Sequence, residues 1–188
     1  MNLARLLISF WIVMGTSAFS GEEWRRWPKG SNEFETTIEI QPGFEVLRWR
    51  PANSLRPAKD APILLGVRLR SPDGKAEFTV VVYYVRNLPR EAEVRRIPLA
   101  AGSGEKATKS KSTHRKVKGE QGNYWIFDQE ITVEGPGYTR YILNRFSTSG
   151  LPGATSDYWE FRVSDESARE RYAAMWKRFK ESLEIGED

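Results

Sequence analysis

The chain has 188 residues, 39% of them hydrophobic, with 29 Lys and Arg, 25 Asp and Glu, a single histidine and no cysteine. Without cysteine there is no disulfide, thiol nucleophile, iron–sulfur cluster, Cys-ligated zinc or cysteine-linked lipid anchor, and one imidazole cannot form a histidine-rich metal site. The apolar content suffices for one packed core, and we expect no metal site.

The first twenty residues have the three parts of a secretory signal. The start carries Arg5, Leu6 to Gly15 is an almost unbroken apolar run, and Ala18-Phe19-Ser20 places small residues where a signal peptidase cleaves. A run of about ten residues is too short to span a bilayer of roughly 30 Å as a helix. We predict a signal peptide over residues 1–20 and an exported, periplasmic or extracellular, single domain over 21–188. An uncleaved N-terminal anchor is the alternative.

Alternation of apolar and polar residues predicts strands along most of the chain. The predicted strands are Glu35–Ile40, Phe44–Arg50, Ile63–Arg70, Ala76–Val85, Tyr124–Glu134, Thr139–Thr148 and Tyr158–Val163. The third and fourth form a central hairpin, because Ser71-Pro72-Asp73-Gly74 between them is typical of a chain reversal. Residues 51–62 and 149–156 are predicted loops.

The segment between residues 90 and 122 breaks the strand pattern. It contains Gly102-Ser103-Gly104, followed by lysines among serines and threonines, and it has few large apolar residues. We predict a solvated, mobile loop or the long tip of a hairpin, inserted between the fourth and fifth strands.

A helix is predicted near the C-terminus. Ser164 is a suitable N-cap, and the acidic residues after it occupy the first turn, where the helix dipole favours negative charge. Apolar residues then recur at spacings of three and four, at Ala168, Tyr172, Met175, Trp176, Phe179 and Leu183. Such a stripe is typical of a face turned to the core rather than to a ligand. We therefore predict an α+β fold, an antiparallel β-sheet packed against one long C-terminal helix.

Catalytic motifs are weak in this sequence. Ser103 and Lys106 match a Ser-x-x-Lys spacing, but they lie in a glycine- and lysine-rich segment and not at a helix start. His114 is interpreted as a solvated histidine. The most plausible pool of catalytic carboxylates is Asp128, Glu130, Asp157 and Glu160. The odd separation of Asp157 and Glu160 places them on opposite faces of a strand, which weakens them as a pair.

Charge distribution is the strongest functional signal. The segment from Arg95 to Lys118 has eight Lys and Arg residues against the acid Glu105, a local net charge of +7, so the rest of residues 21–188 sums to −4. The candidate contacts for an anionic partner are Arg95, Arg96, Lys106, Lys109, Lys111, Arg115, Lys116 and Lys118. An envelope protein, a phospholipid headgroup or an acidic polysaccharide fits this charge. A segment that is merely solvated is the alternative.

Nucleic acid ranks last among the anionic partners. Export removes the usual target, and the basic segment lacks the interleaved aromatic residues on which bases stack.

The last third of the chain resembles the end of small PsbP-like domains. The resemblance is carried by Tyr158-Trp159-Glu160-Phe161 and by a terminal helix closing with Trp176-Lys177-Arg178-Phe179-Lys180-Glu181-Ser182-Leu183, which follows an aromatic-x-x-Phe-x-x-Ser-Leu pattern. Gly43-Phe44 is similar to their entry into the early strands. The resemblance implies an α/β/α sandwich and an exported accessory or binding domain without a cofactor. It transfers no catalytic residue.

These observations together predict an exported, non-enzymatic binding or accessory domain of the bacterial envelope. An exported chain without cysteine and without an Asn-x-Ser/Thr acceptor is more typical of a bacterial envelope than of a eukaryotic secreted protein. The alternative is a hydrolase that acts on an envelope polymer, which requires two carboxyl groups about 5 to 9.5 Å apart in a cleft.

Overall fold

The computed structural model describes residues 24–27, 36–47, 61–85, 104–119, 122–148 and 154–183. The predicted signal peptide lies outside these ranges, as do most of the predicted loops and the residues Arg95, Arg96 and Ser103.

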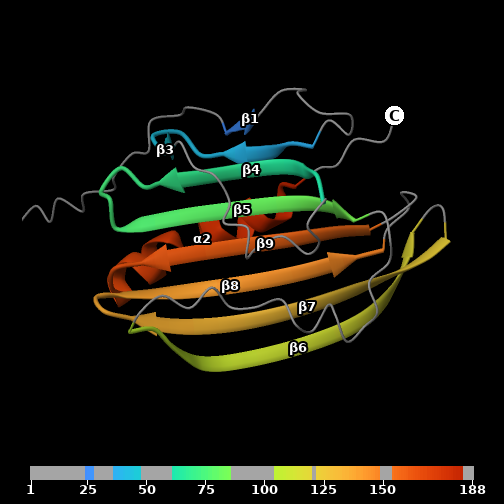
Figure 1. Cartoon of the computed structure of the whole chain (residues 1–188). Coiled ribbons are helices and arrows are strands. Elements are labelled where there is room, and N and C mark those ends of the chain that lie inside the picture. The colour runs from blue at the N-terminus through green and yellow to red at the C-terminus, as the bar shows by residue number, and fades with distance from the viewer. Residues whose placement is uncertain are drawn as a thin grey trace, which may run out of the picture.

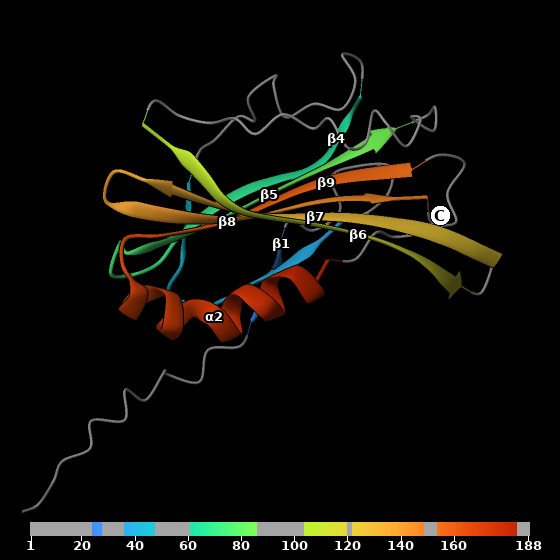
Figure 2. The same cartoon turned by 90° about the horizontal axis from the view of Figure 1, so that it is seen from below.

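The fold is built on an antiparallel sheet with one helix across it (Figures 1 and 2). The seven strands of the main sheet are β3 (Glu45–Leu47), β4 (Ile63–Arg70), β5 (Ala76–Val85), β6 (Lys106–Gly119), β7 (Gly122–Gly135), β8 (Tyr138–Ser147) and β9 (Ala154–Val163). They are arranged in the order β3-β4-β5-β9-β8-β7-β6. A separate pair joins β1 (Arg25–Trp27) to β2 (Ile38–Ile40), and helix α2 spans Glu166–Glu181.

Strand β9 joins the two halves of the main sheet. Along its length it pairs with β5 on one side and β8 on the other, so that Trp159 lies opposite both Val80 and Leu143. The central hairpin β4–β5 is confirmed, with Gly74 at φ 69° in its turn. Because glycine has no Cβ, it adopts this left-handed conformation without steric cost.

Helix α2 covers the middle of one sheet face, over β5 and β9 (Figure 2). Its buried side chains Ala168, Tyr172 and Phe179 belong to the predicted apolar stripe. They pack into an aromatic core in which the ring centroid of Phe78 lies 5.5 Å from Phe179 and 5.0 Å from Phe161. The predicted α+β class is thus confirmed. No helix among the described residues lies on the other face, so the second helical layer of a sandwich stays a prediction.

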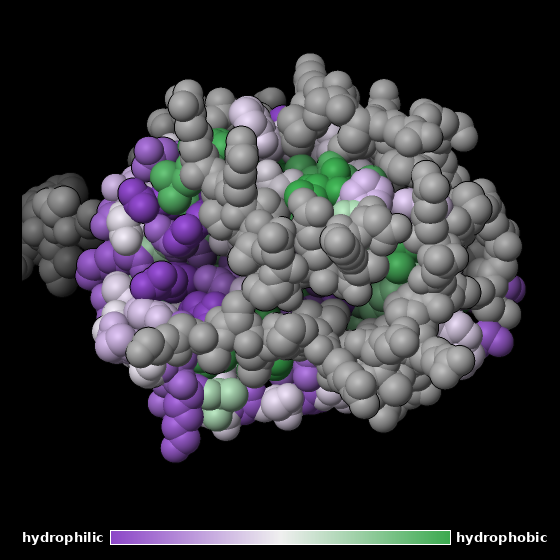
Figure 3. Space-filling view, viewed as in Figure 1, coloured by the Kyte–Doolittle hydropathy of each residue, from purple (hydrophilic) through white to green (hydrophobic). Residues whose placement is uncertain are grey.

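The other face of the sheet carries a second apolar cluster and a charged end. Val81, Tyr83 and Tyr158 are buried there. Hydrophilic side chains gather at the end of the sheet near the β4–β5 turn (Figure 3), where Glu77 forms ion pairs with Arg68 and Arg70. No helix in the described part of the chain has the length and apolarity to cross a membrane.

Of the two predicted forms of the basic segment, the solvated loop is wrong and the long hairpin is closer to the structure. Residues 106–119 form the edge strand β6, which pairs along its length with β7. Every side chain from Lys106 to Lys116 is exposed, so no position in this part of the strand needs an apolar residue. The alternation of apolar and polar residues that usually indicates a strand is therefore missing. Lysines on an edge strand also hinder pairing with another chain.

Two element boundaries also need correction. The N-cap of α2 is Asp165 and not Ser164: the Asp165 carboxylate accepts the backbone N–H of Ala168 at 2.8 Å, and the Ser164 hydroxyl donates to Asp165. Strand β9 begins at Ala154, before the predicted start at Tyr158. Its first residues include Thr155 and Ser156, which are buried but polar. Because they lack the apolar pattern of a buried strand, the sequence predicts a loop there.

Candidate functional site

Strand β6 divides the predicted cationic contacts between the two faces of the sheet. Its register with β7 places Lys109, Lys111 and Arg115 on the face that α2 covers, whereas Lys116 and Lys118 lie on the other face. The structure therefore brings these residues to one edge, but not to one patch.

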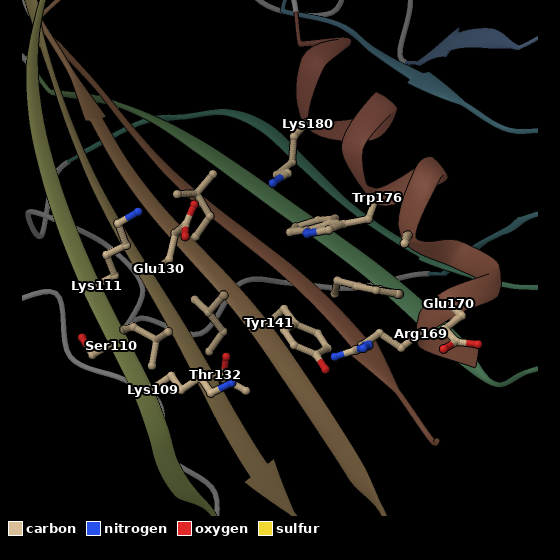
Figure 4. A pocket seen from close by; sticks show the side chains of 15 residues that line it. Lys109, Ser110, Lys111, Glu130, Thr132, Tyr141, Arg169, Glu170, Trp176 and Lys180 are labelled. Carbon is tan, nitrogen blue, oxygen red and sulfur yellow. The ribbon is translucent and has the colours of Figure 1, made fainter. Parts of the chain in front are cut away.

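A groove of about 600 Å³ lies between α2 and the strands β6 to β8 (Figure 4). It exists because α2 packs over β5 and β9 and leaves the helix-side residues of the outer strands uncovered. Its volume falls in the range of roughly 300–1,000 Å³ that is usual for small-molecule sites.

The floor of the groove is aromatic and aliphatic. Tyr141 and Leu143 of β8 and Phe161 of β9 form its sheet side, and Trp176 stands on its helix side. The ring centroid of Phe161 lies 5.8 Å from that of Tyr141 and 5.6 Å from that of Trp176. Tyr141 and Trp176 are partly exposed, so the floor presents an apolar surface to whatever enters.

Four cations and two carboxylates surround this floor. The cations are Lys109, Lys111, Arg169 and Lys180, and the carboxylates are Glu130 and Glu170, which leaves a net charge of +2. Lys111 and Lys180 approach each other across one end of the groove, with Glu130 between them (Figure 4).

Lys180 and Arg169 differ in how well their charges are compensated. Burial lowers the pKa of the Lys180 ammonium, although Glu130 favours its charged form. Its nitrogen lies 4.9 Å from the centroid of the Trp176 ring, and it forms no ion pair with a described carboxylate. Arg169, in contrast, pairs with Glu166 and hydrogen-bonds with Tyr141. Lys180 is therefore the cation with most to gain from an added anion.

A line of charged residues crosses the four strands β6 to β9 on the α2 side of the sheet. Arg145 of β8 binds the Asp128 carboxylate twice, at 2.7 and 3.1 Å, and Arg115 of β6 approaches it at 3.4 Å. Asp157 of β9 lies opposite Arg145 in register and is fully buried. Burial raises its pKa to about 7 against the opposing charge of Arg145, and its Oδ1 has no hydrogen-bond partner among the described residues.

Glu160 lies on the opposite face, as its odd separation from Asp157 predicts. Its carboxylate accepts a hydrogen bond from Arg140 at 3.0 Å and another from the Tyr158 hydroxyl. Arg140 also pairs with Glu105, whose side chain is 4% exposed. These residues form a buried ion network that joins β8, β9 and the start of β6.

His114 is exposed on β6, and its ring packs against two aromatic rings of β7. The centroid of the His114 ring lies 4.0 Å from that of Phe127 and 4.5 Å from that of Trp125, while the Lys116 ammonium lies 5.8 Å from the Trp125 centroid. The segment itself lacks aromatic residues, but its pairing with β7 supplies them. Among the described residues no group of His, Asp and Glu converges as a metal site.

The comparisons with known proteins concern the fold. Neither a protein-family model nor a curated protein sequence matches the chain. Among solved structures, it is similar to the solution structure of cyanobacterial PsbP (CyanoP) from Synechocystis sp. PCC 6803, with a TM-score of 0.50 and 10% sequence identity. The match covers 92% of this chain and 98% of that one. The chain has a PsbP-like fold. At this identity the PsbP-like fold carries over, and no residue role comes with it.

The groove was not predicted from the sequence, although part of its signal was visible. Trp176 and Lys180 are four residues apart on the predicted helix and therefore share a face. The sequence places Trp176 in the apolar stripe, but it does not show that the stripe extends beyond the strands that α2 covers. That depends on the strand order, which brings Tyr141 and Lys111 to the same side as α2.

Proposed function

We propose that this chain is an exported, non-enzymatic accessory domain of the bacterial envelope that docks on an anionic phospholipid surface through β6. The observation that supports the proposal is a row of exposed lysines along β6, the last of the described strands at this edge of the sheet: Lys106, Lys109, Lys111, Lys116 and Lys118. None of the five forms an ion pair with a described carboxylate, whereas Arg115 pairs with Asp128. The envelope location rests on the predicted signal peptide.

The edge of a sheet suits a flat, charged partner. Strand β6 has 14 residues, which extend over about 45 Å at roughly 3.3 Å per residue. Lysines from both faces can reach past the edge because their aliphatic stems are long and flexible. Trp125, which is 41% exposed, lies beside Lys116, and tryptophan is enriched at membrane–water interfaces.

The non-enzymatic part of the proposal rests on how the carboxylates are distributed. Asp157 is fully buried, Asp128 is held by two arginines, and Glu160 lies on the opposite face in an ion network. Glu130 is left as the exposed member of the predicted pool, in the groove. Hydrolysis of a glycan requires two accessible carboxyl groups, and these four residues do not supply such a pair.

Vesicle binding of the full chain tests the proposal. Lys106, Lys116 and Lys118 do not line the groove, and replacing all three by serine should weaken binding to phosphatidylglycerol vesicles by about 3 kcal/mol, roughly 100-fold, at about 1 kcal/mol for each basic side chain. The control variant Lys75→Ser/Arg171→Ser/Lys177→Ser removes the same charge from exposed positions away from β6, and it should bind nearly as the original chain does. The apolar N-terminal segment is common to all variants and cannot produce a difference between them.

Four results would overturn this function. Binding to phosphatidylcholine vesicles that equals binding to phosphatidylglycerol vesicles would remove the electrostatic basis. An equal loss in both triple variants would show that net charge, and not the β6 edge, is responsible. Capture of an acidic polysaccharide without vesicle binding would assign the lysines to a different partner, and absence of both would leave them the protective role of edge-strand lysines.

A further inference from the structure

We infer that the groove between α2 and β6–β8 binds one single-chain amphiphile, with its acyl chain along Tyr141, Phe161 and Trp176 and its anionic head between Lys111 and Lys180. The inference deepens the proposed function and rests on it for the source of the ligand, since a bilayer is where such amphiphiles are found. Of the five proposed docking lysines, Lys109 and Lys111 also line the groove, whereas Lys106, Lys116 and Lys118 do not.

The apolar floor fits a hydrocarbon chain better than a polar ligand. Leu143 and Phe161 are buried at its base, while Tyr141 and Trp176 remain partly exposed above them. Ala173 adds a small side chain on the helix side, where a larger one would fill the space. Covering this surface removes apolar area from water, which contributes roughly 25 cal/mol for each Å².

The head of the ligand is placed by the cations of the groove that form no ion pair with a described carboxylate. Lys111 and Lys180 point toward each other across one end of the groove (Figure 4), and Glu130 between them forms an ion pair with neither. The other end offers Lys109 and Arg169, but Arg169 already pairs with Glu166. A carboxylate or phosphate at the Lys180 end would offset the desolvation of the half-buried ammonium.

The charge balance of the groove limits the ligand to a small anion. Four cations against Glu130 and Glu170 leave a net charge of +2, so a carboxylate or a phosphate monoester is accommodated without excess negative charge. A neutral amphiphile of the same chain length gains the apolar contact but leaves Lys180 without an anion. The groove therefore discriminates by the head rather than by the chain.

Calorimetric titration of the full chain with soluble amphiphiles tests the inference. The probes are dodecanoate and dodecyl phosphate, which share the chain and differ in the anion, with dodecyl maltoside as the neutral counterpart and acetate and inorganic phosphate as heads without chains, all below micelle formation. We expect each anionic amphiphile to bind the chain in a one-to-one ratio. The probe with the higher affinity shows whether the groove prefers a carboxylate or a phosphate head. The neutral amphiphile and the free anions should bind at least about tenfold more weakly, because each lacks one of the two contacts.

Two groove variants and one control locate the binding. Lys180→Gln should weaken the anionic probes about tenfold, the effect of one charge-assisted contact, and leave the neutral probe unchanged. Ala173→Trp should abolish binding of every chain-bearing probe, because position 173 is exposed on the helix and its indole would occupy the groove without entering the core. Lys177→Gln, on the same helix and outside the groove, should leave all affinities unchanged.

The inference fails if Ala173→Trp, with its melting temperature preserved, binds dodecanoate and dodecyl phosphate as the original chain does. It also fails if neutral and anionic probes bind equally. The vesicle experiment separates these failures from failure of the proposed function: Ala173→Trp should still bind phosphatidylglycerol vesicles through β6. If the original chain binds phosphatidylglycerol vesicles but binds no soluble amphiphile, the groove inference is refuted and the proposed membrane docking is not.

Discussion

Asp157 is a fully buried carboxyl, and its replacement by asparagine should change how stability depends on pH. The folded chain raises its pKa from 3.8 to about 7, mainly because burial disfavours the charged form. Its neighbour Arg145 is already bound to Asp128 at 2.7 Å, and the Asp157 Oδ1 atom has no hydrogen-bond partner among the described residues. Asparagine has nearly the same shape and never ionises.

The sign of the effect follows from proton binding. The folded state holds the Asp157 proton up to a higher pH than the unfolded state does. The contribution of Asp157 to the free energy of unfolding therefore falls as pH rises from about 4 to about 7, and it is constant above that interval. At about 1.4 kcal/mol for each pH unit, the interval corresponds to about 4 kcal/mol. We expect the difference in unfolding free energy, Asp157→Asn minus the original chain, to grow by up to this amount between the two ends of the interval.

Urea unfolding measured at a series of pH values checks this expectation. Asp165→Asn is the control, because hydrogen bonding to the backbone N–H of Ala168 lowers the pKa of Asp165. Its carboxylate therefore stabilises the fold above its unfolded pKa, and that contribution is lost as pH falls, which is the opposite slope. A pH-independent difference for Asp157→Asn would refute the reasoning, since it would mean that Asp157 stays ionised beside Arg145.

Two further substitutions test the packing of the two sheet faces. Arg140→Met should destabilise the fold by about 3 to 5 kcal/mol, because it leaves the carboxylates of Glu105 and Glu160 buried without their shared cation; a urea midpoint equal to that of the original chain would contradict this. Phe179→Ala should cost about 3 to 5 kcal/mol through the cavity left under α2. Calorimetry would show it as a lower melting temperature, and an unchanged melting temperature would mean that α2 is not held by this contact.

The elements that local sequence determines are those whose signal lies within a few residues. The helix is predicted by apolar residues at Ala168, Tyr172 and Phe179, which share one face at a period of 3.6 residues. The β4–β5 hairpin is predicted by Ser71 to Gly74, where the Ser71 hydroxyl donates to Asp73 and Gly74 adopts a positive φ. Both signals lie within one short segment, so they can be recognised without knowing the distant residues that the segment packs against.

Strand β6 shows why the basic segment was harder to interpret. Composition alone located the excess of lysine, but it could not show that these residues pair with β7, because an edge strand with both faces exposed has no apolar alternation. This pairing places Lys111 and Lys116 on opposite faces of the sheet, and it brings Trp125 beside Lys116. Both placements enter the proposed function.

The sequence by itself determined the α+β class, the amphipathic helix and the concentration of positive charge in one segment. The tertiary structure decided where the basic side chains lie and which residues surround them. The insertion of β9 between β5 and β8 sets α2 over the middle of the sheet and leaves an aromatic floor beside β6. Lys111 and Lys180, from segments far apart in the chain, line the same groove there. Contacts of this kind depend on the order of strands, which is a global property of the packed chain that no local pattern encodes.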